Sequence, residues 1–342
     1  MTNSNKKREG VIAAGNWIVD HIKIIDVYPV QDSLANIETE YMNNGGSPFN
    51  LLKDLALLEA SFPLRAIGLI GDDADGEWII KECKRYHINI SQIRKTDKVH
   101  TSYTDVMTVK SDGRRTFFHQ RGANALLDIS HFDFSASREK IFHLGYILLL
   151  DKLDIEDNGG VIKAAKILRA AKESGLKTSI DIVSEDSDRF KSVVIPILPF
   201  VDYLFINEFE AERSAGISLK GEIPQLSALR KAARIFIDSG VQDTVFIHFP
   251  KGIYALNSNG EELIQGAVKF PREQIVSTVG AGDAFAAGVI YALHEDWNFE
   301  QTLKLGVCTA AASLTAVSCS DGIKNYKACL RLGEMYSFYQ LY

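Results

Sequence analysis

Short apolar runs recur along the chain, and a helical pattern follows most of them. Apolar residues repeat at helical spacing over residues 161–172 and 226–237, and both segments end at a Ser-Gly pair. The runs expected to be buried strands are residues 11–14, 66–70, 141–147, 178–182, 203–206 and 244–249. This alternation of strand and helix predicts an α/β protein with three layers, α/β/α, around a mainly parallel central sheet.

Other stretches have the pattern of half-exposed strands. Apolar and polar residues alternate over residues 37–42, and residues 103–109 and 116–120 predict a hairpin around Ser111-Asp112-Gly113-Arg114. These strands are expected to form a small β-sheet outside the main one, which we call the lid. The lid strands would come from about residues 16–44 and 98–122.

The rest of the chain gives no sign of separate units. It has no internal repeat, low-complexity segment or Pro-rich linker, so we expect a single domain over residues 10–342 after a disordered tail over residues 1–9. A further hairpin is expected near residues 257–260. The longest apolar run, residues 141–150, is well short of the roughly 20 residues that cross a bilayer, and the first residues lack the apolar stretch of a secretion signal. We therefore expect a cytoplasmic protein without membrane contacts.

Composition and charge narrow the function classes. With 46% hydrophobic and 24% charged residues, the chain is typical of a globular protein with a large core, which excludes disordered and fibrous proteins. The formal net charge is −6 and no long basic run occurs, so no nucleic-acid partner is expected. The four cysteines lack CxxC or metal-ligand spacing and are expected to be reduced. An anionic ligand must therefore be held by local donors.

The strongest chemical signal is Thr-Val-Gly-Ala-Gly-Asp-Ala-Phe at residues 278–285, which leads directly into a helical pattern. Glycines let the backbone approach a ligand, and the first turn of a helix offers unpaired N–H groups and the positive end of its dipole, a combination that binds phosphate. Asp283 would then lie beside the phosphate, where it can take the proton of an attacking hydroxyl. The alternative is an ordinary tight turn in which Asp283 only complements the helix N-terminus.

Several motifs, taken in order, resemble the signatures of the ribokinase-like (PfkB) carbohydrate kinase family. Gly280-Ala281-Gly282-Asp283 is similar to the late signature, and Gly45-Gly46-Ser47-Pro48-Phe49-Asn50, followed by residues 67–76, is similar to the N-terminal one. Further matches are Gly15-Asn16 with Asp20, Gly122-Ala123-Asn124, and Asn207 with Glu210. The resemblance covers about residues 10–325 and implies an ATP-dependent phosphotransferase acting on a hydroxyl of a sugar or sugar-like substrate.

On the substrate side, the resemblance implies that Asp20, Gly45, Gly46 and Asn50 hold the substrate hydroxyls, with Asn16 as a weaker candidate. The chemistry is consistent, because a carboxylate that accepts paired hydroxyl donors orients a polyol and glycines let the backbone reach it. Asp20 also fits a solvated loop acid.

On the nucleotide side, the resemblance implies an anion hole at Gly280, Ala281 and Gly282, with Asp283 as the catalytic base. The residues implied for ATP are Asn207, Lys251, Gly252, Thr278, Gly280 and Gly282, and those implied for Mg²⁺ are Asn207 and Glu210. Amide and carboxylate oxygens suit a hard cation. Asn207 and Glu210 also fit a helix capping box, and Lys251 also fits an exposed loop lysine.

Two positions depart from the family pattern. The family commonly carries Asp two residues before Val279, where this chain has Ser277, so a K⁺ site there is in doubt. Relatives usually have a Gly near the start of the loop Phe249-Pro250-Lys251-Gly252, where only Gly252 remains. The nucleotide-side loop is therefore open to a different shape.

The lid segment is rich in aromatic and basic residues. Aromatic rings cover the apolar face of a sugar, and arginines would suit an acidic sugar or a phosphate. The residues concerned are Tyr103, Arg114, Arg115, Phe117, Phe118, His119 and Arg121. A closing lid would also exclude water from the phosphoryl group. Family members often dimerise through the lid, so a homodimer is expected.

Other functions were weighed against this one. A dinucleotide-dependent oxidoreductase needs Gly-x-Gly-x-x-Gly after the first strand, and Gly15-Asn16-Trp17 begins no such pattern. A calcium loop at residues 71–82 would lack its first ligand, because Gly71 has no side chain, so residues 72–76 are expected to form a turn. No zinc-protease or serine-hydrolase motif occurs. A nucleoside kinase of the same fold, and a non-catalytic ligand-binding protein on that fold, stay open as alternatives.

Overall fold

The computed structural model describes residues 7–342, so most of the expected tail over residues 1–9 lies outside the described residues. The strands are β1 (Val11–Gly15), β2 (Ile18–Ile25), β3 (Ile37–Gly45), β4 (Leu64–Gly71), β5 (Asn89–Thr96), β6 (Ser102–Val109), β7 (Arg115–Gln120), β8 (Ile141–Ile147), β9 (Lys177–Ile182), β10 (Tyr203–Asn207), β11 (Thr244–Phe249), β12 (Gly252–Asn257) and β13 (Glu262–Gly266). The helices are α1 (Ser47–Leu57), α2 (Ala74–Arg85), α3 (Lys163–Glu173), α4 (Phe190–Ile197), α5 (Glu208–Ala215), α6 (Leu226–Asp238), α7 (Ala281–His294), α8 (Phe299–Ser313) and α9 (Tyr326–Tyr336).

The main sheet has the strand order β13-β12-β11-β10-β9-β8-β1-β4-β5. Along the sheet, β5, β4, β1, β8, β9, β10 and β11 pair in parallel. Strands β12 and β13 extend the sheet beyond β11 with antiparallel pairing. Along β1, Val11 and Ala13 pack into one hydrophobic core while Ile12 and Ala14 pack into the other. Strands that are buried on both faces have continuous apolar sequences, so they could be predicted from the sequence. The predicted α/β class is confirmed.

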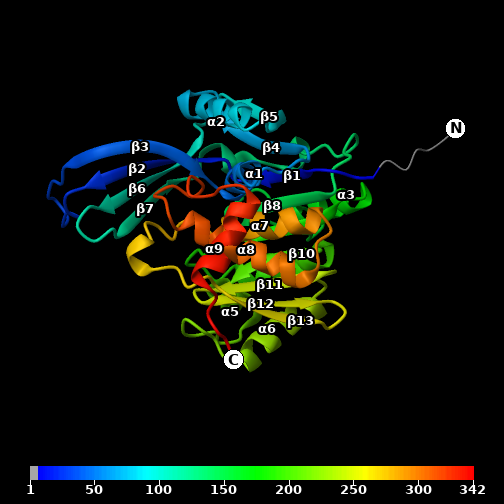
Figure 1. Ribbon diagram of the computed structural model, residues 1–342. Coiled ribbons are helices and arrows are strands. Elements are labelled where there is room, and N and C mark those ends of the chain that lie inside the picture. Colours follow the sequence, from blue (N-terminus) through cyan, green and yellow to red (C-terminus); the bar gives the residue numbers. More distant parts are fainter. Residues whose placement is uncertain (1–6) are drawn as a thin grey trace.

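Helices cover both faces of the main sheet (Figure 1). Helices α1, α2, α7, α8 and α9 contribute to one core, and α3, α4, α5 and α6 contribute to the other. Because the central strands are parallel, their carboxyl ends lie at one edge of the sheet. Open α/β sheets bind their ligands at this edge.

The lid is a separate sheet with the strand order β3-β2-β6-β7, and it extends away from the main body in Figure 1. Its root is fixed by Asn124, whose side chain accepts a hydrogen bond from the Trp17 backbone N–H and donates one to the Trp17 carbonyl, both at 3.1 Å. Backbones approach closely at the root as well. A Cβ on Gly46, where φ is +85°, would lie 1.9 Å from the Asn16 carbonyl oxygen.

One local expectation was wrong. Residues 72–76 do not form a turn that ends the preceding strand, because α2 begins at Ala74 and Asp73 caps it by accepting from the Gly76 N–H at 2.9 Å. Asp73 also accepts from the backbone N–H of Thr101 at 2.7 Å. Its carboxylate therefore ties the start of α2 to the lid root.

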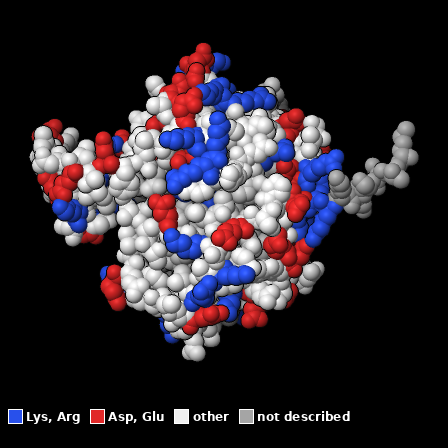
Figure 2. Space-filling model, turned by 45° about the horizontal axis from the view of Figure 1, so that its top comes forward, with Lys and Arg blue, Asp and Glu red and all other residues white. Residues whose placement is uncertain are grey.

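Within residues 7–342, none of the helices combines the length and the apolar character that a membrane crossing requires. On the face shown in Figure 2, Lys and Arg side chains lie intermingled with Asp and Glu side chains.

Candidate active site

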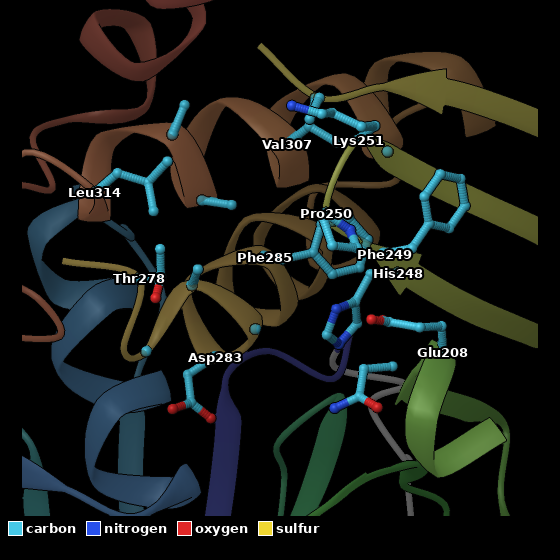
Figure 3. A pocket seen from close by; sticks show the side chains of 18 of the residues that line it. Glu208, His248, Phe249, Pro250, Lys251, Thr278, Asp283, Phe285, Val307 and Leu314 are labelled. Carbon is cyan, nitrogen blue, oxygen red and sulfur yellow. The ribbon is translucent and has the colours of Figure 1, made fainter. Parts of the chain in front are cut away.

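A cleft of about 770 Å³ opens at the carboxyl edge of the main sheet (Figure 3). Its walls come from the ends of β8, β9 and β10, the turn between β11 and β12, the start of α7 and one side of α8. The volume lies within the range of cofactor-sized and nucleotide-sized sites. Most of its lining is apolar, with polar groups gathered around Asp283 and Asn207.

The first turn of α7 faces this cleft and has no side-chain cap. Gly280 is the N-cap residue with φ +79°, and the first intrahelical bond runs from the Ala284 N–H to the Gly280 carbonyl at 2.9 Å. The Ala281 N–H makes a long bond of 3.4 Å to the Thr278 carbonyl, and the N–H groups before Ala284 have no acceptor within the helix. A Cβ on Gly280 would lie 2.5 Å from the Cβ of Cys319, so the close approach requires glycine. The turn can therefore bind an anion, as the sequence predicts.

Asp283 is buried at the start of α7, and one of its carboxylate oxygens is held by two donors. Oδ2 accepts from the Tyr146 hydroxyl at 2.6 Å and from the Asn50 side-chain amide at 2.7 Å. Oδ1 is buried and has no partner among the described residues. The carboxylate is thus fixed in orientation and keeps one oxygen free to accept a proton.

The electrostatics of this carboxylate favour proton transfer. Burial raises the pKa of Asp283 above its usual range, and interactions with Tyr146, Asn50 and the neighbouring Asp181 act in the opposite direction. The pKa of the neighbouring Asp181 is raised well above the ordinary value by burial and by the negative charge of Asp283. Two carboxyl groups in such an environment do not ionise together readily. The base is therefore flanked by a second carboxyl group whose pKa is also raised.

A polar network continues from Asp283 towards the lid. The Asn50 Oδ1 accepts from the Asn44 amide at 2.6 Å, and the Lys53 ammonium donates to Asn44 Oδ1 at 2.7 Å. Lys53 also pairs with Asp321 at 3.3 Å. Asn50, which the sequence assigns to the substrate side, thereby contacts the predicted base directly and is oriented by buried neighbours.

Asp20 and the double glycine lie together, as predicted. A Cβ on Gly45 would lie 2.5 Å from Asp20 Oδ1, so the strand pair β2–β3 can hold this carboxylate only beside a glycine. Burial raises the pKa of Asp20 to about 7, with an opposing hydrogen bond from Thr104 and a further upward effect from the charge of Asp283. This environment differs from that of a solvated loop acid.

Asn16 has a different setting from the other substrate-side candidates. It is fully buried, and its side-chain amide donates to the Leu149 carbonyl at 2.9 Å while its Oδ1 accepts from the Tyr146 N–H. These contacts engage both polar ends of the amide within the protein. They position the end of β8, and with it Tyr146.

Asn207 and Glu210 form the capping box that the sequence left open as an alternative. Asn207 Oδ1 accepts from the Glu210 N–H at 2.8 Å, and Glu210 Oε2 accepts from the Asn207 N–H at 2.9 Å. Burial raises the pKa of Glu210 to about 7. Both residues line the cleft, so the cap and a role in nucleotide binding are compatible.

The cleft floor also allows a test of the expected Mg²⁺. Asp181, Asn207, Glu208 and Glu210 supply oxygen donors of the kind that hard cations prefer. Among residues 7–342, however, no three acidic, His or Cys side chains converge as a metal cluster. The donor set fits an ion that is held mainly by nucleotide phosphates and water.

Lys251 and Gly252 line the cleft in the tight turn between β11 and β12. The Lys251 ammonium lies 4.5 Å from the centre of the Tyr339 ring and 3.6 Å from a Glu222 carboxylate oxygen. In Figure 3, Lys251 and Asp283 lie at opposite ends of the pocket. Lys251 is therefore engaged by the C-terminal segment, far from the anion-binding turn.

Thr278 and Ser277 precede the anion-binding turn. Thr278 lines the cleft, whereas the buried Ser277 accepts at Oγ from the Val279 N–H at 3.1 Å and from the Arg115 guanidinium at 2.6 Å. The position where the family commonly has Asp is thus linked to the lid.

Sequence reasoning missed Tyr146 and Asp181. Both are polar residues at the ends of otherwise apolar strands, β8 and β9, whose carboxyl ends face the cleft. A polar side chain at the carboxyl end of a predicted parallel strand is the signal that would have found them.

Comparison with known proteins identifies the family. Residues 14–325 match the pfkB family carbohydrate kinase description. The chain belongs to the pfkB carbohydrate kinase family. The resemblance stated from the motifs is therefore confirmed, and the chain is a sugar or nucleoside kinase of the ribokinase family.

Curated pfkB relatives are similar over nearly the whole chain. Ribokinase from Haemophilus influenzae is 23% identical over 332 residues, covering 96% of this chain and 99% of the relative. The 5-dehydro-2-deoxygluconokinase of Clostridium perfringens is 23% identical and covers 94% and 92%. A probable chloroplastic fructokinase-6 from Arabidopsis thaliana is 29% identical and covers 87% and 73%.

Solved structures confirm the ribokinase-like fold. Ribokinase from Arabidopsis thaliana, complexed with ribose and ATP, has a TM-score of 0.77 at 20% identity, covering 97% of this chain and 99% of that one. A Burkholderia thailandensis nucleoside kinase in complex with inosine has a TM-score of 0.73 at 15% identity, covering 96% and 100%.

Proposed function

We propose that this pfkB kinase transfers the γ-phosphate of ATP to a hydroxyl of a sugar or sugar-like acceptor, with Asp283 as the general base. The observation that carries the proposal is the geometry of Asp283. One carboxylate oxygen is fixed by Tyr146 and Asn50, and the other is buried with no hydrogen-bond partner within residues 7–342, beside a helix N-terminus without a side-chain cap.

In the proposed reaction, the acceptor hydroxyl loses its proton to Asp283 Oδ1 as its oxygen bonds to the γ-phosphorus. The bond between that phosphorus and the bridging oxygen of ADP breaks. The N–H groups of Gly280, Ala281 and Gly282 would stabilise the negative charge on the transferred group, because they are fixed donors at the positive end of a helix.

The other predicted residues take supporting roles. Asp20 and the Gly45–Gly46 backbone would orient the acceptor, and the apolar part of the cleft would hold the nucleotide base. Mg²⁺, when bound with the nucleotide, neutralises phosphate charge, and Asn207 and Glu210 would hold it through water. A cytoplasmic location and a homodimer through the lid stay predictions, and a K⁺ site stays open because Ser277 stands where the family commonly has Asp.

The test is ADP release from Mg·ATP with a panel of neutral sugars, sugar acids, sugar phosphates and nucleosides. We expect turnover on one class, and Asp283→Asn should lower kcat about 10³-fold, in line with the loss of a general base. ATP affinity should change little, as measured by calorimetry.

Asp154→Asn is a matched control, because Asp154 is also a buried aspartate but does not line the cleft. Its kcat should stay near that of the wild type. Wild-type turnover by Asp283→Asn would overturn the assignment of the base. ATP binding without turnover on any acceptor would favour the non-catalytic alternative.

A further inference from the structure

A second, smaller cavity of about 300 Å³ lies between the lid and the segment before α7. Arg115 and Phe117 on β7 and Gly113 in the lid turn form one wall, and residues 275–279 form the other. The cavity thus reaches from the predicted substrate lid to the residue that precedes the anion-binding turn.

Among the described residues Arg115 forms no ion pair although it is partly buried, whereas Arg114, which also forms none, is exposed. The Arg115 guanidinium donates to the neutral Ser277 Oγ at 2.6 Å, and its Nε is buried without an acceptor among the described residues. By contrast, Lys23 pairs with Asp105, Lys110 with Glu38 and Arg121 with Asp151. A buried guanidinium N–H without an acceptor is costly, and a ligand that supplies the acceptor removes that cost.

Electrostatic effects on Asp20 link Arg115 to the reacting groups. The pKa of Asp20 is raised chiefly by burial, raised further by the charge of Asp283, and lowered by the charge of Arg115. The charges of Asp283 and Arg115 therefore both act on the Asp20 carboxyl group. The bond to Ser277 and the shared cavity place Arg115 against the segment that leads into the anion-binding turn, so an acceptor whose hydroxyl meets Asp283 can extend towards Arg115.

We infer that Arg115 binds an anionic group of the acceptor, a carboxylate or a phosphate monoester, at the end away from the phosphorylated hydroxyl. This inference rests on the proposed function. The planar guanidinium matches either anion with two parallel N–H donors, and such charge-assisted bonds are about twice as strong as neutral ones. A neutral polyol offers Arg115 no comparable partner. The acceptor class is accordingly sugar acids or sugar phosphates.

A purely mechanical role for Arg115 gives a different expectation. If its bond to Ser277 only holds the lid against residues 275–279, then removing the positive charge should weaken all acceptors equally. Arg115→Gln removes the charge, and its shorter side chain also gives up the bond to Ser277, so a loss confined to anionic acceptors points to charge recognition and an equal loss to the mechanical role. Arg114→Gln is the matched control, since Arg114 is exposed in the lid turn and does not line the cavity.

The experiment measures binding by calorimetry without ATP, and turnover with Mg·ATP, for matched acceptor pairs. The pairs are six-carbon sugar acids with their neutral counterparts, and fructose 6-phosphate with fructose. We expect the wild type to bind one anion at least tenfold tighter than its neutral counterpart. Arg115→Gln should lose that preference, and Arg114→Gln should keep it. The preferred pair decides between carboxylate and phosphate.

The outcomes separate this inference from the kinase assignment. Equal affinity for the members of every pair would overturn the anion site, even if a neutral sugar or nucleoside is phosphorylated and the kinase stands. An equal loss of affinity for all acceptors in Arg115→Gln would also overturn the anion site, in favour of the mechanical role. Preferential anion binding that Arg115→Gln abolishes, without turnover on any acceptor, would support the site and count against the proposed reaction.

Discussion

Helices α5 and α7 begin at the same edge of the main sheet, but the backbone N–H groups of their first turns are satisfied in different ways. At the start of α5, Asn207 and Glu210 satisfy each other's backbone N–H groups in a capping box. At the start of α7, the N-cap is Gly280, and no side chain accepts from the first turn. The first arrangement stabilises the helix from within the chain, whereas the second leaves donors for a ligand.

The difference shows how one kind of local sequence can serve structure or function. Both helices carry an acidic residue in the first turn, Glu210 in one and Asp283 in the other. Glu210 turns back to its own backbone, but Asp283 is drawn away from it by Tyr146 and Asn50. A helix start is therefore a candidate anion site only when its acidic residue is held by other elements.

Among changes that act on the two helix starts, the largest effect is expected from closing the open start of α7. Gly280→Ala forces a positive φ on a residue with a Cβ and places that Cβ 2.5 Å from the Cβ of Cys319. The displaced N–H groups should lower kcat/KM for ATP about 100-fold, as the loss of a fixed oxyanion donor does. Steady-state kinetics with Mg·ATP measures this effect.

Gly216→Ala is the control for backbone strain alone. Gly216 ends α5 with φ +70°, and an added Cβ there would have no heavy atom within 4 Å. It should cost about 1 kcal/mol of unfolding free energy and leave kcat/KM unchanged. Equal kinetic losses in both variants would show that the α7 start has no special role.

An intermediate effect is expected from releasing Asp283 Oδ2. Tyr146→Phe removes a hydrogen bond that lowers the pKa of Asp283, so that pKa should rise further. Because the base acts in its ionised form, the acidic limb of the kcat/KM profile should move to higher pH. At neutral pH, kcat should fall about tenfold, the cost of a hydrogen bond to a charged group.

Tyr254→Phe removes a similar bond, from its hydroxyl to Glu262 at 2.9 Å, at the far edge of the main sheet. Its pH profile should coincide with that of the wild type. A profile for Tyr146→Phe that also coincides would exclude an effect of Tyr146 on the base.

The smallest effect is expected from breaking the capping box. Asn207→Ala removes the cap of α5 and should lower the unfolding free energy by about 1 kcal/mol. If Asn207 also holds Mg²⁺ through water, the Mg²⁺ concentration for half-maximal activity should rise about threefold, a loss well under 1 kcal/mol. Chemical denaturation and magnesium titration measure the two effects.

Asn298→Ala is the matched control, because Asn298 caps α8 by accepting from the Gln301 N–H at 2.9 Å and does not line the cleft. It should reproduce the loss of stability with an unchanged magnesium requirement. The same requirement in Asn207→Ala would reduce Asn207 to a helix cap.

The sequence predicted the buried parallel strands well because burial on both faces makes them uniformly apolar. The prediction of residues 141–147 coincides with β8, and that of residues 244–249 coincides with β11. Strand β5 was missed, because it lies at the edge of the sheet and its Asn89–Thr96 sequence is mostly polar and half-exposed. Helix α8 was missed because it is buried nearly all round and lacks an amphipathic period.

Site residues with a local motif could be located, and those defined by distant contacts could not. Asp283 and Gly280 became candidates through the glycine pattern, and Asp20 and Asn50 through the order of family motifs; the structure brings them to one region. The bond from Arg115 to Ser277 joins residues 162 positions apart and leaves no local pattern. The same holds for Tyr146 and Asp283, which are 137 positions apart.

The course of the chain through the two sheets has a consequence for the gene. The lid strands and the main-sheet strands β1, β4 and β5 all lie before residue 121. The residues that line the cleft begin at Tyr146. A recombination point between β7 and β8 would therefore exchange the acceptor half of one kinase for that of another without cutting a strand. The contacts across the junction would have to stay compatible, including the pairing of β1 with β8, the packing of α1 on α7 and side-chain pairs such as Asn50 with Asp283.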